Sequence, residues 1–104
     1  MKNHIFIFGP DSPKKDAIWE IVKEYFSSSK QTAVFSGYPA DKKEENFIVY
    51  LFEGNQEKID SSEKFSLYDR YYDIGSDRQD SVIAGEIIAA HKNWCKENGI
   101  LLQY

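Results

Sequence analysis

The chain has 104 residues, which is the usual length of one domain. Hydrophobic residues make up 41% of the chain and aromatic residues 15%, which is enough to build a core. Charged residues make up 29% and mix both signs, which argues against a disordered chain. No apolar run approaches the roughly 18 residues that cross a bilayer, so we expect one globular domain over residues 1–104 with no membrane partner.

The net charge of -4 is concentrated in the middle of the chain. Residues 41–80 carry eleven acidic against six basic side chains, whereas the two flanking segments are close to neutral. Nucleic-acid binding needs a basic surface, and base readout favours Arg, but only Arg70 and Arg78 are present. We therefore expect no nucleic-acid partner and favour a basic protein partner.

One cysteine, Cys95, excludes an internal disulfide, and with only two histidines it makes a zinc site implausible. The N-terminal Met-Lys-Asn-His run lacks the pattern of a signal peptide. We expect a reducing, cytoplasmic location, with no metal and no cofactor.

The first forty residues predict a strand, a helix and a second strand. Residues 4–8 are a short β-branched and aromatic run, typical of a buried strand. Ser12 followed by Pro13 indicates an N-cap and first helical position, and apolar residues at helical spacing extend the helix over 13–28. Residues 32–35 form the next strand, and a unit of this length favours a parallel crossover.

The second half predicts two further strands and a helix. Residues 47–52 are the most hydrophobic stretch and lack alternation, which indicates a central strand covered on both faces. Residues 65–72 alternate, as expected for a half-exposed strand near a sheet edge. Asp80 or Ser81 caps a second helix that ends at Asn98-Gly99.

A final strand over residues 100–102 completes the predicted order β-α-β-β-β-α-β. Two helices and about five short strands make an α/β (mixed α+β) domain, in which one mixed sheet carries helical cover. No internal repeat or linker interrupts this pattern.

The segment from Gly9 to Lys15 follows a strand and opens a helix, which is the setting of a phosphate-binding loop. It departs from the G-x-x-x-x-G-K-[ST] pattern, because Lys14 replaces the second Gly and Asp16 replaces the metal-holding Ser or Thr. A capped helix start explains these residues better. A small ligand- or phosphate-binding domain that uses Gly9, Ser12, Lys14 and Lys15, with possible catalysis, is the alternative function.

His91 and Cys95 are four residues apart on the second predicted helix and are therefore neighbours. A thiol beside an imidazole is the beginning of a nucleophile pair. Both residues lie on or beside the apolar stripe, and no third group is identifiable to orient the imidazole. We expect a core pair with no catalytic role, and no enzymatic activity for the chain.

The run from Tyr68 to Asp73 interleaves tyrosines with carboxylates beside a turn. Tyrosine offers a large contact area at low entropic cost, and carboxylates add charge complementarity. Strand alternation predicts that Tyr68 and Tyr72 lie on the face opposite Tyr71. The nearby acidic residues match no calcium-binding loop.

These features predict a small acidic interaction protein that binds a basic protein: a stoichiometric inhibitor, an immunity-type antagonist or an adaptor. A third possibility is a subunit of a larger assembly, in which another chain covers residues 47–52 and 100–102. The expected contact residues are the tyrosines and acids of one segment, joined by two further exposed aromatic residues: Tyr68, Asp69, Tyr71, Tyr72, Asp73 and Asp77, with Trp19 and Tyr38.

Overall fold

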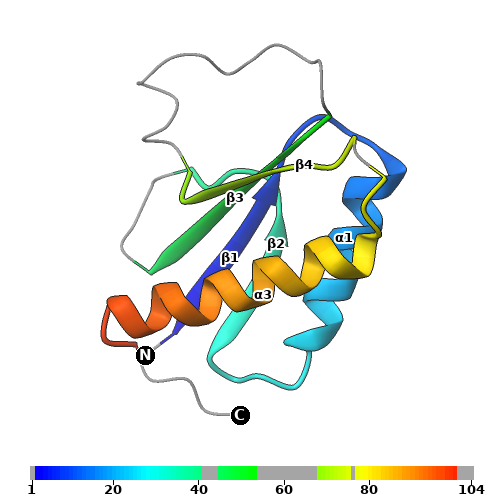
Figure 1. Cartoon of the computed structure of the whole chain (residues 1–104). Helices are drawn as coiled ribbons and strands as arrows, with labels where there is room; N and C mark the ends of the chain where they lie inside the picture. The colour runs from blue at the N-terminus through cyan, green and yellow to red at the C-terminus, as the bar shows by residue number, and fades with distance from the viewer. Residues whose placement is uncertain (1, 41–44, 54–67, 76, 101–104) are drawn as a thin grey trace.

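The computed structural model describes residues 2–40, 45–53, 68–75 and 77–100. These residues form two helices and four strands, and Figure 1 shows their arrangement. The predicted α/β domain with two helices is thereby confirmed. The elements follow one another as β1 (Asn3–Phe8), α1 (Pro13–Tyr25), β2 (Thr32–Ser36), β3 (Asn46–Phe52), β4 (Arg70–Asp73) and α3 (Asp80–Glu97).

The four strands form one sheet in the order β2-β1-β3-β4, and every neighbouring pair is parallel. The expectation of a mixed sheet of about five strands is therefore wrong for the described residues. Parallel neighbours need crossover connections, and the strands here are separated by stretches longer than a tight hairpin turn. The parallel crossover predicted for the first strand–helix–strand unit is confirmed, whereas the hydrophobic pattern of the later strands does not specify their direction.

Two strands differ from their predicted bounds. The strand expected over residues 65–72 begins only at Arg70, and residues 65–67 lie outside the described part of the chain. Of the last expected strand, over residues 100–102, only Ile100 is described. It is buried after the end of α3 and belongs to no strand.

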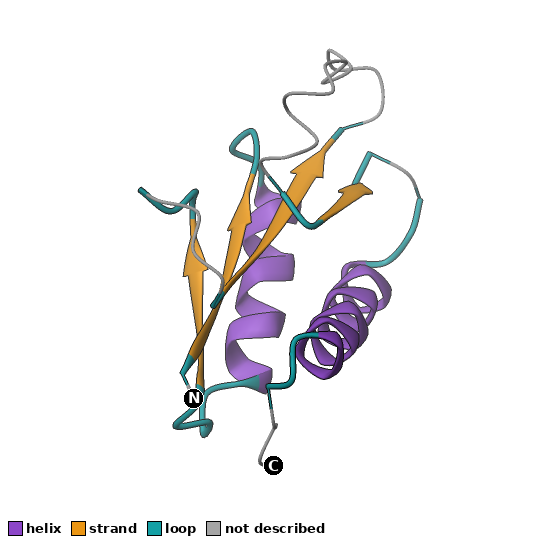
Figure 2. Ribbon diagram, turned by 90° about the vertical axis from the view of Figure 1, so that its left-hand side faces the viewer, coloured by secondary structure: helices purple, strands orange, loops and turns teal. Residues whose placement is uncertain are grey.

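Both helices cover the same face of the sheet (Figure 2). Along β1, Ile5 and Ile7 point to this face and are fully buried. Phe47, Val49 and Leu51 of β3 join them in one apolar cluster. The helices contribute the other half of this cluster through Ile18, Val22, Ile83, Ile87, Trp94 and Cys95.

The start of α1 confirms the capping signal. The Oγ of Ser12 accepts a hydrogen bond from the backbone N–H of Lys15 at 3.0 Å, and Pro13 occupies the first turn. The helix ends at Tyr25, three residues earlier than expected. The cap expected at Asp80 or Ser81 is wrong, because Gln79 is the N-cap of α3 and its side chain makes no capping bond.

Neither described helix combines the length and the apolar character required to cross a membrane.

Gly9 provides a test of how the end of β1 approaches β3. Its φ is +148°, and a Cβ at this position would collide with the carbonyl oxygen of Leu51. We predict that Gly9→Ala lowers the free energy of unfolding by about 3 kcal/mol, because a strained backbone and a backbone clash add together. Equilibrium unfolding in urea measures this loss.

Gly37 is the matched control, since its φ is +118° but a Cβ added there would meet no atom within 4 Å. Gly37→Ala should cost only about 1 kcal/mol, from backbone strain alone. Equal losses for the two variants would show that the Gly9–Leu51 approach is not a tight constraint.

Candidate functional site

The sheet face opposite the helices is lined by aromatic rings. Along β1, every second side chain, at His4, Phe6 and Phe8, points away from the buried positions. The strand register places Phe6 beside Phe35 of β2. We call this surface the aromatic face, and it consists of His4, Phe6, Phe8, Phe35, Tyr38, Tyr50, Phe52, Tyr68 and Tyr71.

The rings of the aromatic face form two groups of contacts, one in each of two successive rows of the sheet. In the first row Phe6 and Phe35 are stacked, with ring centroids 5.0 Å apart. In the next row the register aligns Phe8 with Tyr50 and Tyr50 with Tyr71. The Phe8 and Tyr50 centroids are 4.8 Å apart. The second group extends over β1, β3 and β4 and also carries phenol hydroxyls.

Three rings of this face are well exposed. Tyr71 is 54% exposed, Phe35 43% and Tyr38 40%. Isolated exposed rings are ordinary, but contiguous aromatic surface on a globular domain usually marks an interaction site. Parallel sheets are normally covered on both faces, and the two described helices cover only one. On the other face Ile48, which pairs with Phe6, is fully buried, while these three rings remain exposed.

The structure brings together three of the predicted contact residues, Tyr38, Tyr68 and Tyr71, on the aromatic face. The rings of Tyr68 and Tyr71 meet edge to face at 5.9 Å. The prediction that they lie on opposite faces is wrong, because Tyr68 precedes the first residue of β4 and strand alternation does not extend to it.

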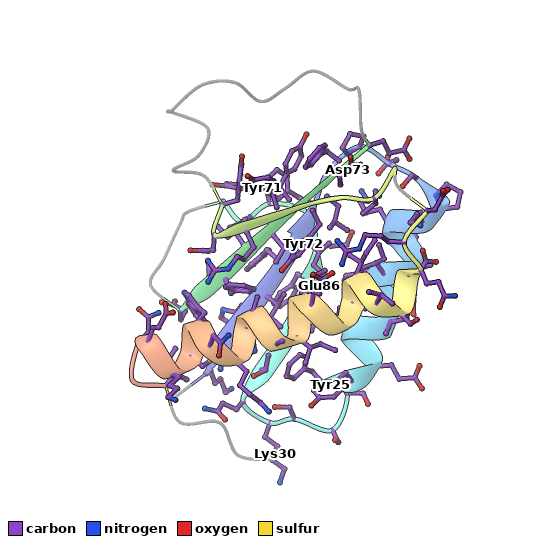
Figure 3. The ribbon with its side chains drawn as sticks, viewed as in Figure 1. Tyr25, Lys30, Tyr71, Tyr72, Asp73 and Glu86 are labelled. Carbon is purple, nitrogen blue, oxygen red and sulfur yellow. The ribbon has the colours of Figure 1, made fainter. Side chains whose placement is uncertain are left out.

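Two other predicted contact residues lie on the helix side. Figure 3 shows Tyr72 directed toward α3 and Glu86, while Tyr71 points away from them. The Tyr72 hydroxyl donates to the Glu86 carbonyl oxygen at 3.5 Å. Trp19 packs against the core of the domain, with the Lys23 ammonium 4.7 Å from the centre of its ring. Neither residue belongs to the aromatic face.

Carboxylates border the aromatic face. Asp69 accepts the backbone N–H of Ile48 at 2.8 Å, so it also holds the entry to β4 against β3. Asp73 lies beside Phe52 in the strand register and accepts the backbone N–H of Gly75 at 2.8 Å. Asp77, in contrast, is exposed on the connector before α3. Two of the three predicted acidic contacts thus also stabilise the local fold.

Three tyrosines of the aromatic face have a pKa above the ordinary value of a phenol. Burial raises the pKa of Tyr50. Burial, and then the neighbouring Tyr71 and Tyr50, raise the pKa of Tyr68. For Tyr38 burial is the larger cause, and the negative charge of Asp69 raises its pKa further. These groups therefore present hydroxyls rather than charges to a partner.

The residues of the alternative anion site have internal partners. Lys15 is 5% exposed, and its ammonium donates to the Gly9 carbonyl oxygen and to Asp11, each at 3.0 Å. The ammonium of Lys14 lies 3.4 Å from a carboxylate oxygen of Asp80 at the start of α3. With Ser12 serving as the helix cap, these side chains close the loop onto the domain rather than opening a phosphate cradle.

His91 and Cys95 form a buried polar cluster with Asn3. The Nε2 of His91 lies 2.8 Å from the Oδ1 of Asn3 and 3.4 Å from the Cys95 sulfur. Burial lowers the pKa of His91 to about 4 and raises the pKa of Cys95 to about 11. Both groups are neutral at physiological pH, which argues for the expected core role and against an activated thiolate.

Within the described ranges, no three His, Cys, Asp or Glu side chains are grouped so that they could hold a metal ion. No family model, no curated protein and no solved structure matches this chain. A proposal for the function therefore has to rest on the surface chemistry of the described residues.

The buried imidazole predicts an acid sensitivity of the fold. Because the pKa of His91 falls from 6.5 to about 4 on folding, its contribution is fully present above pH 6.5 and is lost as the pH falls toward 4. Between pH 7 and pH 5 the free energy of unfolding should drop by about 2 kcal/mol from this group. Urea unfolding at the two pH values measures the drop.

His91→Gln should largely abolish this pH-dependent drop in the free energy of unfolding, even if the variant is less stable at neutral pH. His4→Gln is the matched control and should retain it, since His4 is only partly buried on the aromatic face. A drop of the same size in His91→Gln would assign the acid sensitivity to another group.

Proposed function

We propose that this chain is a small interaction protein that binds a basic protein partner through the aromatic face. The two groups of contacting rings on the face opposite the helices are the observation that supports this role most strongly. A stoichiometric inhibitor, an immunity-type antagonist and an adaptor all use such a surface, and each of these three roles is compatible with it.

The residue types of the aromatic face favour a protein as the occupant. Tyrosine is enriched among the few residues that carry most of the binding energy in protein interfaces. Tyr71 and Tyr38 are exposed, while Tyr68 is 8% exposed and packs against the ring of Tyr71. A rigid sheet presents these rings with little loss of conformational entropy on binding.

The charges favour a basic partner. The chain carries 17 acidic and 13 basic residues. Asp69 and Asp73 lie along the border of the aromatic face, and Glu45 precedes β3 on the same side. Carboxylates around an apolar surface attract a positively charged protein and repel phosphate, so nucleic acid is the less favoured occupant.

The ligand-binding alternative has less support. Lys15 and Lys14, which would have to receive an anion, already bind Asp11 and Asp80. Catalysis is not favoured either, because the thiol and imidazole that lie together are neutral and buried.

A pair of tyrosine variants tests the proposal. Tyr71 on the aromatic face is 54% exposed and Tyr25 on α1 is 49% exposed, and Figure 3 shows them far apart. With the partner captured from a host lysate and then purified, Tyr71→Ala should weaken the affinity by about 30-fold, the loss expected of a central interface tyrosine. Isothermal titration calorimetry measures both variants.

Tyr25→Ala should change the affinity by less than about two-fold, since this ring lies on the helix side. The association rate should also fall as salt is added, because charge steering is screened. The proposal would be refuted by a partner that binds Tyr71→Ala as tightly as the unaltered protein and loses affinity for Tyr25→Ala.

A further inference from the structure

A hollow of about 380 Å³ opens at one end of the aromatic face. It lies where the first residues of β1 and β3 meet the residues that follow β2. Its walls combine rings, small residues and polar groups. They are formed by His4, Phe6, Phe35, Tyr38, Pro39, Ala40, Glu45 and Asn46.

The apolar part of the hollow consists of ordered rings. Phe6 and Phe35 stack at 5.0 Å with an interplanar angle of 21°. The imidazole of His4 meets Phe35 edge to face at 5.7 Å. Because Phe35 and Tyr38 are 43% and 40% exposed, part of their ring surface is accessible to a ligand.

The polar part of the hollow is rich in acceptors. The Nδ1 of His4 lies 3.0 Å from the Oδ1 of Asn46, and because an amide oxygen accepts, this nitrogen donates in that contact. The backbone of Glu45 is fixed beside the same strand, since its carbonyl oxygen accepts the His4 N–H at 2.9 Å. Among the described residues that line the hollow, Glu45 is the one that carries a carboxylate.

We propose that this hollow receives an arginine side chain of the basic partner. The proposal rests on the function proposed above and names the group that the partner inserts. A guanidinium is planar, stacks on aromatic faces and donates hydrogen bonds in its own plane. Phe35 and Tyr38 supply the rings, and Glu45 supplies the opposite charge.

Other occupants match these walls less well. A phosphate or carboxylate would meet the Glu45 charge, and the lining residues that the structure describes include no Lys or Arg to compensate it. A purely apolar side chain would leave the Glu45 carboxylate without a donor. Lysine brings the charge, but its compact ammonium is more strongly hydrated and does not stack.

The test uses small probes rather than the unidentified partner. N-acetyl-arginine amide is titrated to millimolar concentration into ¹⁵N-labelled full-length protein, and amide shifts are followed by NMR. Shifts should concentrate at His4, Phe35, Tyr38 and Glu45. N-acetyl-lysine amide should produce weaker shifts at the same residues, and N-acetyl-norleucine amide should produce almost none.

Two variants assign the contacts. Glu45→Gln should raise the Kd for N-acetyl-arginine amide about three- to five-fold, the range of an exposed ion pair. Phe35→Leu should raise it by a similar factor of about three, through loss of cation–π contact. Glu24→Gln on the exposed side of α1 is the matched control and should leave the Kd unchanged.

Equal shifts from the arginine and norleucine probes, or no shifts at these four residues, would overturn the inference. An unchanged Kd in Glu45→Gln would do the same. The function proposed above fails separately, on the Tyr71→Ala and Tyr25→Ala comparison. Sedimentation of the unliganded protein completes the test, because a dimer that buries the hollow against a second copy would also overturn the arginine assignment.

Discussion

The two-residue period of β1 is the constraint on which the rest of the structure depends. This strand pairs with β2 on one side and with β3 on the other, so its alternation sets the faces of the whole sheet. Ile5 and Ile7 point into the core beneath both helices, and Phe6 and Phe8 therefore point to the opposite face. A slip of one residue would exchange the core for the aromatic face and abolish both.

Burial in the resulting core also makes side chains unreactive that would be reactive in a more exposed place. The imidazole of His91 is fully buried beneath the sheet, where it interacts with Asn3 and with the thiol of Cys95. The ammonium of Lys15 is turned inward to the Gly9 carbonyl oxygen. These potentially reactive side chains are thus used for structure. The aromatic face, bordered by carboxylates, is left as the surface suited to recognition.

The two levels of the proposed function depend on different parts of this surface. In the proposed function, general affinity for a partner would come from the row of rings that ends at Tyr71, the most exposed ring of the aromatic face. Selection of an arginine would depend on the hollow beside Phe35 and Glu45. A broad apolar surface with one polar hollow is a common way to combine binding strength with specificity.

The local elements could be predicted from sequence, because each depends on residues that lie close together in the chain. Examples are the β-branched and aromatic run of β1, the Ser12 cap of α1 and the apolar stripe of α3. The alternation of His4, Phe6 and Phe8 is a signal for the aromatic face, although the run as a whole predicts only a buried strand. The parallel pairing of β1 with β2 was also predictable, from the length of the strand–helix–strand unit. The parallel direction of β3 and β4, the side on which the helices pack, and the contact of Phe6 with Phe35 emerged only in the folded chain. Parallel pairing joins residues far apart in sequence, and no local pattern specifies which strands become neighbours.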